Sequence, residues 1–213
     1  KYRQEGKKIF FMTNNSTKSR KQIWEKLTGM GLKCSYDEVY TSGYAAALYA
    51  KQMGYHTVYI MGSKALEEEF GELDITVSDQ AEVVIVGYDM TFDYQKLTDA
   101  LQVAFHADKI IACNKERHYP GENAKRMPGC GAMVGALEGS LGREVDYSVG
   151  KPNPLLMEII CKDNDLRPEE VVVVGDTYES DIVMAQNYGS SAVYIGEEDH
   201  KDIKCIHAIG ELL

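Results

Sequence analysis

Short apolar runs along the chain alternate with longer segments in which apolar residues recur every three or four positions. The runs predict β-strands over residues 8–13, 38–41, 57–61, 75–77, 82–87, 109–112, 171–174 and 191–195. The periodic segments predict helices over residues 18–30, 44–53, 63–70, 92–107, 131–139, 152–164 and 180–189. This alternation is typical of parallel α/β architecture.

Two segments differ from the rest. Residues 171–174 are four consecutive valines, which favour a strand at the centre of a parallel sheet with helices on both faces. Residues 114–131 are rich in polar residues, glycine and proline, and we expect a long irregular loop there. Loops of that length in a compact domain are usually functional or mobile.

Polar side chains follow two of the predicted strands, and a lysine precedes a helix. Ligands of open α/β sheets bind beyond the carboxyl ends of the strands. Thr13 and Asn14 offer a hydroxyl and a backbone N–H beside a helix start, a combination that favours phosphate. Asp176 and Asp181 offer two carboxylates, which suit Mg²⁺. Lys151 could neutralise phosphate charge.

Each of these features also has a purely structural interpretation. Asp176 or Ser180 could cap the helix that follows, since both residue types are common caps. Thr13 and Asn14 could belong to an ordinary polar turn. Lys151 could be a solvated surface residue. Taken singly, none of these residues identifies a function.

Composition excludes several classes of protein. The 213 residues carry a formal net charge of −10 with no basic run, which argues against nucleic acid as a partner. No apolar run approaches the roughly 18 residues of a membrane span, so we expect no membrane partner. The five cysteines form no C-x-x-C motif, and we expect free thiols in a reducing, cytoplasmic setting. The run Gly129-Cys130-Gly131 lacks the spacing of a dinucleotide-binding fingerprint.

Three motifs in a fixed order are more informative than any one of them. They are F-M-T-N-N-S-T (11–17), G-K-P-N-P (150–154) and V-V-V-V-G-D-T-Y-E-S-D-I (171–182). The combination resembles the haloacid dehalogenase (HAD) superfamily of phosphatases, in the branch of 4-nitrophenylphosphatase, phosphoglycolate phosphatase and NagD-type enzymes, subfamily IIA. The resemblance implies a HAD-like, doubly wound parallel core of the Rossmann type. That core would comprise residues 1–54 and 147–213, with a large inserted α/β cap domain over 55–146.

The resemblance also implies roles for the residues at the strand ends. Thr13 would hydrogen-bond the transferring phosphoryl group, with the backbone N–H of Asn14 beside it. Lys151 would stabilise negative charge on that group. Asp176 would bind Mg²⁺, and Asp181 would orient Lys151 or a metal-bound water.

Substrate-binding residues are expected in two further places. Asn15 belongs to the polar loop after the first strand, where it would shape the loop and contribute to substrate binding. Asn114, Glu116 and Arg117 lie in the long segment of the cap, which we expect to close over the leaving group. Asn114-Lys115-Glu116 departs from the Asn-Pro-Asp that is common in this branch, as Thr177 departs from its usual Arg or Asn.

The implied reaction is Mg²⁺-dependent hydrolysis of a small phosphorylated metabolite: a sugar phosphate, phosphoglycolate or a nucleotide. It would proceed through an aspartyl-phosphate whose carboxylate lies in a D-x-D strand upstream of Lys1, beside residues 171–174. Residues 1–213 alone are therefore expected to be inactive and unstable. A catalytically inactive phosphate-binding or regulatory module and a phosphotransferase are the alternatives. A homodimer is the expected assembly.

Overall fold

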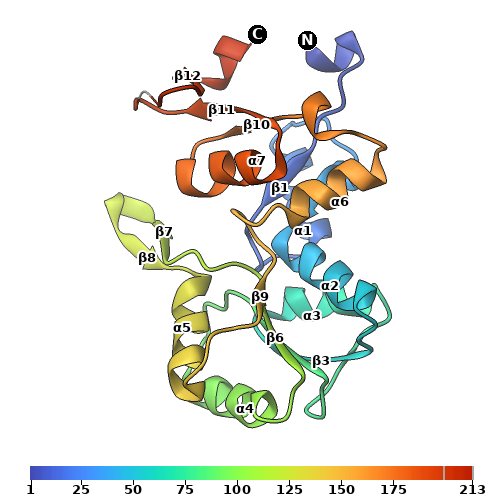
Figure 1. The fold of residues 1–213 in the computed structure, drawn as a ribbon, viewed down its shortest axis with the longest axis vertical. Coiled ribbons are helices and arrows are strands. Elements are labelled where there is room, and N and C mark those ends of the chain that lie inside the picture. Colours follow the sequence, from blue (N-terminus) through green and yellow to red (C-terminus); the bar gives the residue numbers. More distant parts are fainter. Residues whose placement is uncertain (199, 213) are drawn as a thin grey trace. The chain divides into compact units, whose positions relative to one another are not determined.

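The computed structural model describes residues 1–198 and 200–212, whose contacts divide into two compact units (Figure 1). The first unit comprises Lys1–Phe10 and Lys151–Leu213, and the second comprises Phe11–Gly150. This boundary differs from the expected core (1–54 and 147–213) and cap (55–146), because residues 11–54 group by contact with the middle of the chain. The division into core and cap stays a prediction.

Both units contain helices and strands close to the predicted positions. The helices are α1 (Arg20–Gly29), α2 (Ser42–Gln52), α3 (Lys64–Gly71), α4 (Tyr94–Ala104), α5 (Cys130–Leu141), α6 (Leu155–Asp163) and α7 (Val183–Tyr188). The strands are β1 (Phe11–Thr13), β2 (Val39–Thr41), β3 (Thr57–Met61), β4 (Thr76–Val77), β5 (Val83–Val86), β6 (Lys109–Ala112), β7 (His118–Pro120), β8 (Arg126–Pro128), β9 (Tyr147–Ser148), β10 (Val172–Gly175), β11 (Ser191–Ile195) and β12 (Lys204–Ile206).

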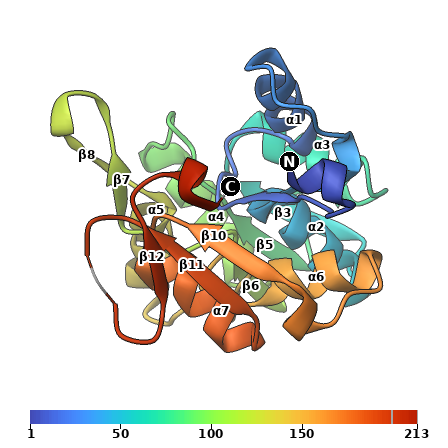
Figure 2. The same ribbon diagram turned by 90° about the horizontal axis from the view of Figure 1, so that it is seen from above.

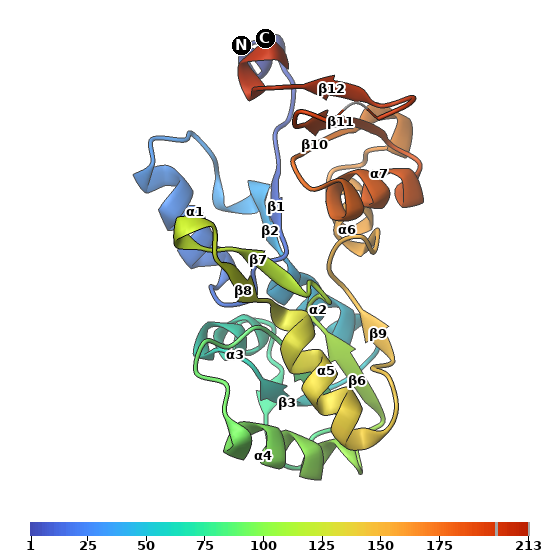
Figure 3. The ribbon, with the colours of Figure 1, turned by 90° about the vertical axis from the view of Figure 1, so that its left-hand side faces the viewer.

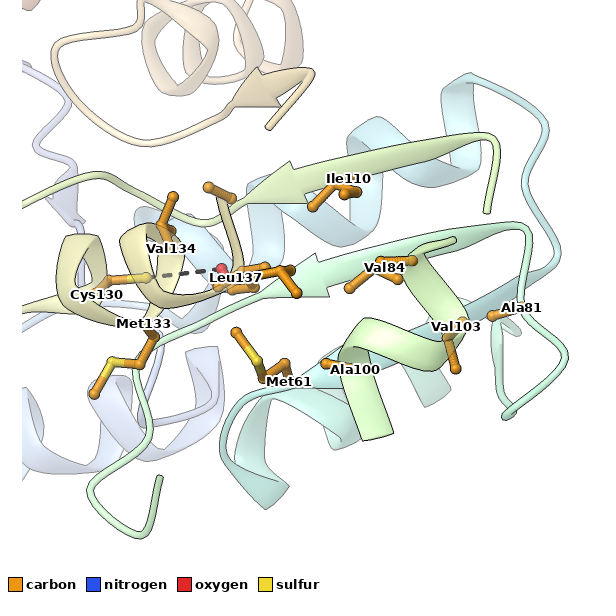
Figure 4. Close-up of a cluster of buried hydrophobic side chains, with 13 residues drawn as sticks. Met61, Ala81, Val84, Ala100, Val103, Ile110, Cys130, Met133, Val134 and Leu137 are labelled. Carbon is orange, nitrogen blue, oxygen red and sulfur yellow. Dashed lines mark hydrogen bonds between the residues drawn. The ribbon is translucent and has the colours of Figure 1, made fainter. Parts of the chain in front are cut away.

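A five-stranded parallel sheet organises the second unit, in the order β4-β3-β5-β6-β9. Every residue of β5 is fully buried, as expected for a central parallel strand covered on both faces. Val84 and Val86 belong to one apolar cluster with residues of α4 and α5, two helices that pack against each other (Figure 3). Figure 4 shows this cluster, in which the Cys130 thiol points to the carbonyl of Val86.

A separate two-stranded parallel sheet carries the first polar loop of the second unit. β1 pairs with β2 so that Thr13 lies opposite Thr41. Both strands therefore end at the same edge, and the residues that follow, Asn14 and Ser42, are neighbours. This register brings together two polar positions that are 28 residues apart in the sequence.

The expectation of an irregular loop over residues 114–131 is wrong. Strands β7 and β8 pair antiparallel, with Tyr119 opposite Met127, and form a hairpin at the N-terminal end of α5 (Figure 1). Pro120 and Pro128 occupy strand ends, where a missing N–H is tolerated. The sequence pattern did not predict this hairpin, because its strands have only three residues each and both end in proline.

The first unit contains the parallel sheet β10-β11-β12 with α6 and α7 beside it (Figure 2). The valine run was expected at the centre of a sheet, but β10 lies at the edge of this one and pairs with β11 alone among the described residues. Val172 is accordingly 55% exposed.

Within the described residues, no helix combines the length and the apolar character needed to cross a membrane.

Candidate functional site

The loop after β1 presents the first set of candidate groups. The Oγ1 of Thr13 accepts a hydrogen bond from the backbone N–H of Asn15 at 3.1 Å. A hydroxyl that accepts one hydrogen bond keeps its own hydrogen for another partner. Thr13 can therefore donate to an anionic oxygen, as its expected role requires.

Asn15 itself turns toward its own loop. Its Oδ1 accepts hydrogen bonds from the backbone N–H groups of Thr17 and Lys18, at 3.0 and 3.1 Å, and from the Thr17 hydroxyl at 3.1 Å. The helix α1 then begins with a capping box between Ser19 and Gln22. Through these hydrogen bonds the Asn15 side chain holds its own loop together. Its contribution to substrate binding stays a prediction.

Asn14 lies at the centre of a polar cluster that we call the Asn14 group: Asn14, Ser42, Asn114 and Glu116. The carbonyl oxygen of Asn14 accepts hydrogen bonds from Ser42 Oγ and Asn114 Nδ2, each at 2.8 Å. The Nδ2 of Asn14 donates to Glu116 Oε1 at 2.9 Å. Asn14, Ser42 and Asn114 are all buried. Two of the residues expected to contact substrate thus contact Asn14.

The backbone around Glu116 is fixed by two glycines at the start of α5. Gly131 donates its N–H to the carbonyl of Glu116 at 2.8 Å, and Gly129 donates to that of Arg117 at 2.9 Å. A Cβ at Gly129 would lie 2.3 Å from the Glu116 carbonyl oxygen, so no side chain fits there. The Arg117 side chain is exposed. The run Gly129-Cys130-Gly131 therefore serves close backbone packing.

A second set of groups lies in the first unit: Asp176 and Asp181 follow β10, and Lys151 precedes α6. Lys151 Nζ lies 2.6 Å from Asp181 Oδ1, and the two side chains are only 12% and 8% exposed. Asp181 Oδ2 accepts the backbone N–H of Thr177 at 3.2 Å. A carboxylate held at both oxygens fixes the position of its ammonium partner. This is the contact through which Asp181 would orient Lys151.

Asp176 follows β10 directly, and its side chain is exposed. The described residues contain no group of three or more His, Cys, Asp or Glu side chains that could hold a metal ion. Asp176 can offer one oxygen ligand, which fits Mg²⁺, an ion that usually keeps several waters and binds few protein carboxylates. Its role as a ligand stays a prediction.

The capping interpretation of Asp176 or Ser180 is wrong, because the N-caps of the turn and of α7 are Thr177 and Ile182, without a side-chain cap bond. Ser180 lies in a π-helical turn (Tyr178–Ile182) whose N-cap is Thr177, with no side-chain cap bond. Its hydroxyl is buried and has no hydrogen-bond partner among the residues that the structure describes.

Two buried cysteines near the Asn14 group are poor nucleophiles. Burial raises the pKa of the Cys113 thiol well above its ordinary value, against a smaller opposing effect of its hydrogen bond with Ser16. Burial likewise raises the pKa of Cys130 to about 12. Both side chains are thiols at neutral pH, and nucleophilic catalysis by cysteine needs the thiolate.

Comparison with known proteins agrees with these features. A family model of haloacid dehalogenase-like hydrolases matches residues 1–76, and a HAD-hydrolase-like model matches residues 148–208. The sugar-phosphatase AraL of Bacillus subtilis is 32% identical over 197 residues, which are 91% of this chain and 72% of AraL. The chain belongs to the haloacid dehalogenase-like hydrolases.

Other HAD relatives match the same share of this chain. The chloroplastic phosphoglycolate phosphatase 1A of Arabidopsis thaliana is 30% identical, over 91% of this chain and 60% of its own length. The solved structure of a p-nitrophenyl phosphatase from Archaeoglobus fulgidus superposes with a TM-score of 0.86 and 32% identity, over 91% of this chain and 75% of that one. The expected HAD-like α/β fold and the subfamily IIA resemblance are thereby confirmed.

Ser42 is the member of the Asn14 group that the motifs of this HAD chain did not reveal. The signal was nevertheless present, because Ser42 follows the short predicted strand 38–41 as Asn14 follows the strand before it. Parallel neighbouring strands bring their carboxyl ends to one edge. A search for polar residues after every predicted strand would have found it.

Proposed function

We propose that the protein is a Mg²⁺-dependent phosphomonoester hydrolase that acts on a small phosphorylated metabolite. The observation that carries the proposal is the buried ion pair in which Asp181 holds the Lys151 ammonium. A charge that is already fixed in place stabilises a phosphoryl group without reorganisation during the reaction. The relatives named for sugar phosphates, phosphoglycolate and p-nitrophenyl phosphate support this chemistry. The proposed substrate is a sugar phosphate, phosphoglycolate or a nucleotide.

In this proposal Thr13 donates its hydroxyl hydrogen to a phosphoryl oxygen. The loop of Asn14 and Asn15 holds the Thr13 hydroxyl in position, because hydrogen bonds within the Asn14 group and to Thr13 fix the backbone of this loop. Lys151 supplies positive charge, and Asp181 keeps its ammonium in place. Asp176 would hold Mg²⁺, which when bound neutralises phosphoryl charge.

The proposed route forms a covalent intermediate. A carboxylate oxygen bonds to phosphorus as the bond from phosphorus to the leaving oxygen breaks, and water then hydrolyses the acyl phosphate. The family resemblance assigns this carboxylate to the first Asp of a D-x-D strand.

The setting is proposed to be cytoplasmic, with the small metabolite as partner and a homodimer as assembly. The five cysteines are free in the structure, which is compatible with a reducing compartment.

The test is phosphate release by the full-length protein from p-nitrophenyl phosphate, glycerol 3-phosphate, 2-phosphoglycolate and a hexose phosphate, with and without Mg²⁺. Lys151→Ala should lower kcat by about 100-fold or more, because it removes a fixed charge on the phosphoryl group. Lys162→Ala, which removes an exposed lysine of α6, is the control and should change nothing. A wild-type protein that binds inorganic phosphate but hydrolyses none of these esters would reject the proposal in favour of an inactive phosphate-binding module.

A further inference from the structure

The peptide group between Asn14 and Asn15 is held at both of its polar atoms. Its carbonyl oxygen accepts hydrogen bonds from Ser42 and Asn114, each at 2.8 Å. Its N–H donates to Thr13 Oγ1 at 3.1 Å. The orientation of this one peptide therefore decides which way the lone pairs, and hence the hydroxyl hydrogen, of Thr13 are directed.

The side chain of Asn14 is held as well, by a residue far away in the sequence. Asn14 Nδ2 donates to Glu116 Oε1 at 2.9 Å, across 102 positions of the chain. Glu116 is tied in turn to Asn114, whose Oδ1 accepts the Glu116 N–H at 3.1 Å. Asn114 thus uses its amide nitrogen on the Asn14 carbonyl and its amide oxygen on the Glu116 backbone.

There is little space in which this arrangement could relax. A Cβ at Gly150 would lie 2.6 Å from Asn14 Oδ1 and 2.7 Å from Asn114 Cβ. Gly131 donates its N–H to the Glu116 carbonyl oxygen, and a Cβ at Gly129 would lie 2.3 Å from that oxygen. Close packing of this kind transmits a small displacement directly to its neighbours.

We propose that Asn114 and Glu116 are positioning residues, which fix the Asn14 peptide and so aim the Thr13 hydroxyl at the phosphoryl group. This rests on the proposed phosphatase function and replaces direct contact of Asn114 and Glu116 with the leaving group. The Glu116 side chain accepts its hydrogen bond from Asn14, and the Asn114 side chain bonds to the Asn14 carbonyl and to the Glu116 backbone N–H. Asn114 and Glu116 therefore affect the transfer of the phosphoryl group, which all phosphate esters share.

Glu116 allows a test by two variants. Glu116→Ala removes the acceptor and leaves the Asn14 amide without this partner, whereas Glu116→Gln keeps a carbonyl oxygen that can still accept. We expect Glu116→Ala to lower kcat about 10- to 100-fold, the loss typical of a displacement near 1 Å at a reacting group. Glu116→Gln should restore kcat to near the wild-type value.

The leaving group provides the decisive comparison. The loss in Glu116→Ala and in Asn114→Ala should be the same, within about threefold, for p-nitrophenyl phosphate, 2-phosphoglycolate and a hexose phosphate, because a common phosphoryl step is affected. Lys115→Ala is the matched control: its exposed side chain pairs with Glu138, and the substitution should leave kcat and KM unchanged. Losses that differ strongly between esters would overturn the proposal in favour of substrate contact.

A second readout does not depend on turnover. Hydrogen exchange of the Asn15 backbone N–H in the full-length protein should be faster in Glu116→Ala and in Asn114→Ala than in the wild type, and unchanged in Glu116→Gln and Lys115→Ala. Thermal melts of the same proteins identify a variant that has simply lost its fold. Glu116→Gln as impaired as Glu116→Ala would also overturn the proposal. A wild-type protein inactive on every ester would instead reject the function, while the exchange data would still report the positioning.

Discussion

Gly175 lies so close to Asp181 that only glycine, which has no Cβ, fits at this position. A Cβ at Gly175 would come within 2.3 Å of the Asp181 Cβ and 2.4 Å of its Oδ2. The carboxylate that holds Lys151 is therefore seated directly against the backbone at the end of β10. This explains in physical terms why Gly precedes Asp176 in the third motif.

Gly175→Ala should displace Asp181 and weaken its hold on Lys151. We expect a loss of about 1–3 kcal/mol in the free energy of unfolding from overpacking, together with a clear fall in kcat. Gly139→Ala on α5 is the matched control: a Cβ there meets nothing within 4 Å, and the change should stabilise the helix by about 0.5–1 kcal/mol. Urea unfolding and steady-state kinetics measure both effects. A Gly175→Ala protein with wild-type stability and kcat would contradict this account of Asp181.

Asp176→Asn tests the proposed Mg²⁺ ligand. Replacing a charged oxygen ligand by a neutral amide should weaken Mg²⁺ binding and lower kcat at a fixed Mg²⁺ concentration by about 100-fold or more. Calorimetric titration of the full-length protein with Mg²⁺ measures the binding directly. Glu179→Gln removes another exposed carboxylate of the same segment and should have little effect. If Asp176→Asn keeps its Mg²⁺ affinity, Asp176 is not a ligand.

Much of the α/β pattern could be predicted because each element carries its own signal. The strands β3, β6 and β11 begin and end at the predicted residues, since a polar residue precedes each of these short runs of β-branched or aromatic residues and glycine follows two of them. Strand β9 has two residues and β12 has three, too few for any periodicity to appear. Such strands form because a neighbour offers its edge, which is a tertiary effect.

Helix α1 shows how tertiary packing overrides a pattern. The apolar residues of the predicted helix 18–30 recur at helical spacing, yet Met30, which follows α1, is 69% exposed, and the buried residue of the helix is Arg20. The guanidinium of Arg20 lies over three aromatic rings, 4.6 Å from that of Tyr36, 5.1 Å from that of Tyr40 and 4.2 Å from that of Tyr44. Cation–π contacts with residues 16 to 24 positions away leave no periodic signal in the sequence.

The same contrast between local sequence signals and long-range packing applies to the candidate site. Thr13, Asn14, Lys151 and Asp181 were predicted because strand ends and short motifs mark them. The contact of Asn14 with Glu116 was not predicted, because it depends on how the chain around Gly131 folds back. Local sequence identifies the polar groups, whereas the long-range packing decides which group each of them contacts.

Arg117 and Glu116 were both expected to bind substrate, and their side chains lie in different surroundings. The Arg117 side chain is exposed, whereas Glu116 contacts Asn14. Arg117→Ala should therefore change the ratio of kcat/KM between 2-phosphoglycolate and p-nitrophenyl phosphate by about tenfold, because a guanidinium pairs well with a substrate carboxylate. Arg126→Ala, an exposed arginine on β8, is the control. An unchanged ratio would remove Arg117 from the substrate-binding residues.

The last prediction concerns a carboxyl group that is buried away from the candidate site. Glu69 on α3 is only 2% exposed and accepts a hydrogen bond from the backbone N–H of Arg20 at the start of α1. Burial, with a smaller contribution from Glu72, raises the pKa of Glu69 from 4.5 to about 7, although the Arg20 N–H opposes the shift. The folded protein therefore holds the Glu69 proton more tightly than the unfolded chain does.

Because the folded pKa is the higher one, the stability that Glu69 contributes is present below pH 4.5 and is lost as the pH rises through about 7. A shift of this size corresponds to about 3 kcal/mol in the free energy of unfolding. Relative to Glu69→Gln, which cannot ionise, the wild type should lose stability by up to that amount between pH 4.5 and 8. Urea unfolding across this range measures the difference, with Glu25→Gln, an exposed position on α1, as the control. Parallel pH profiles for the wild type and Glu69→Gln would mean that folding does not raise the pKa of Glu69, because the Arg20 N–H compensates its burial.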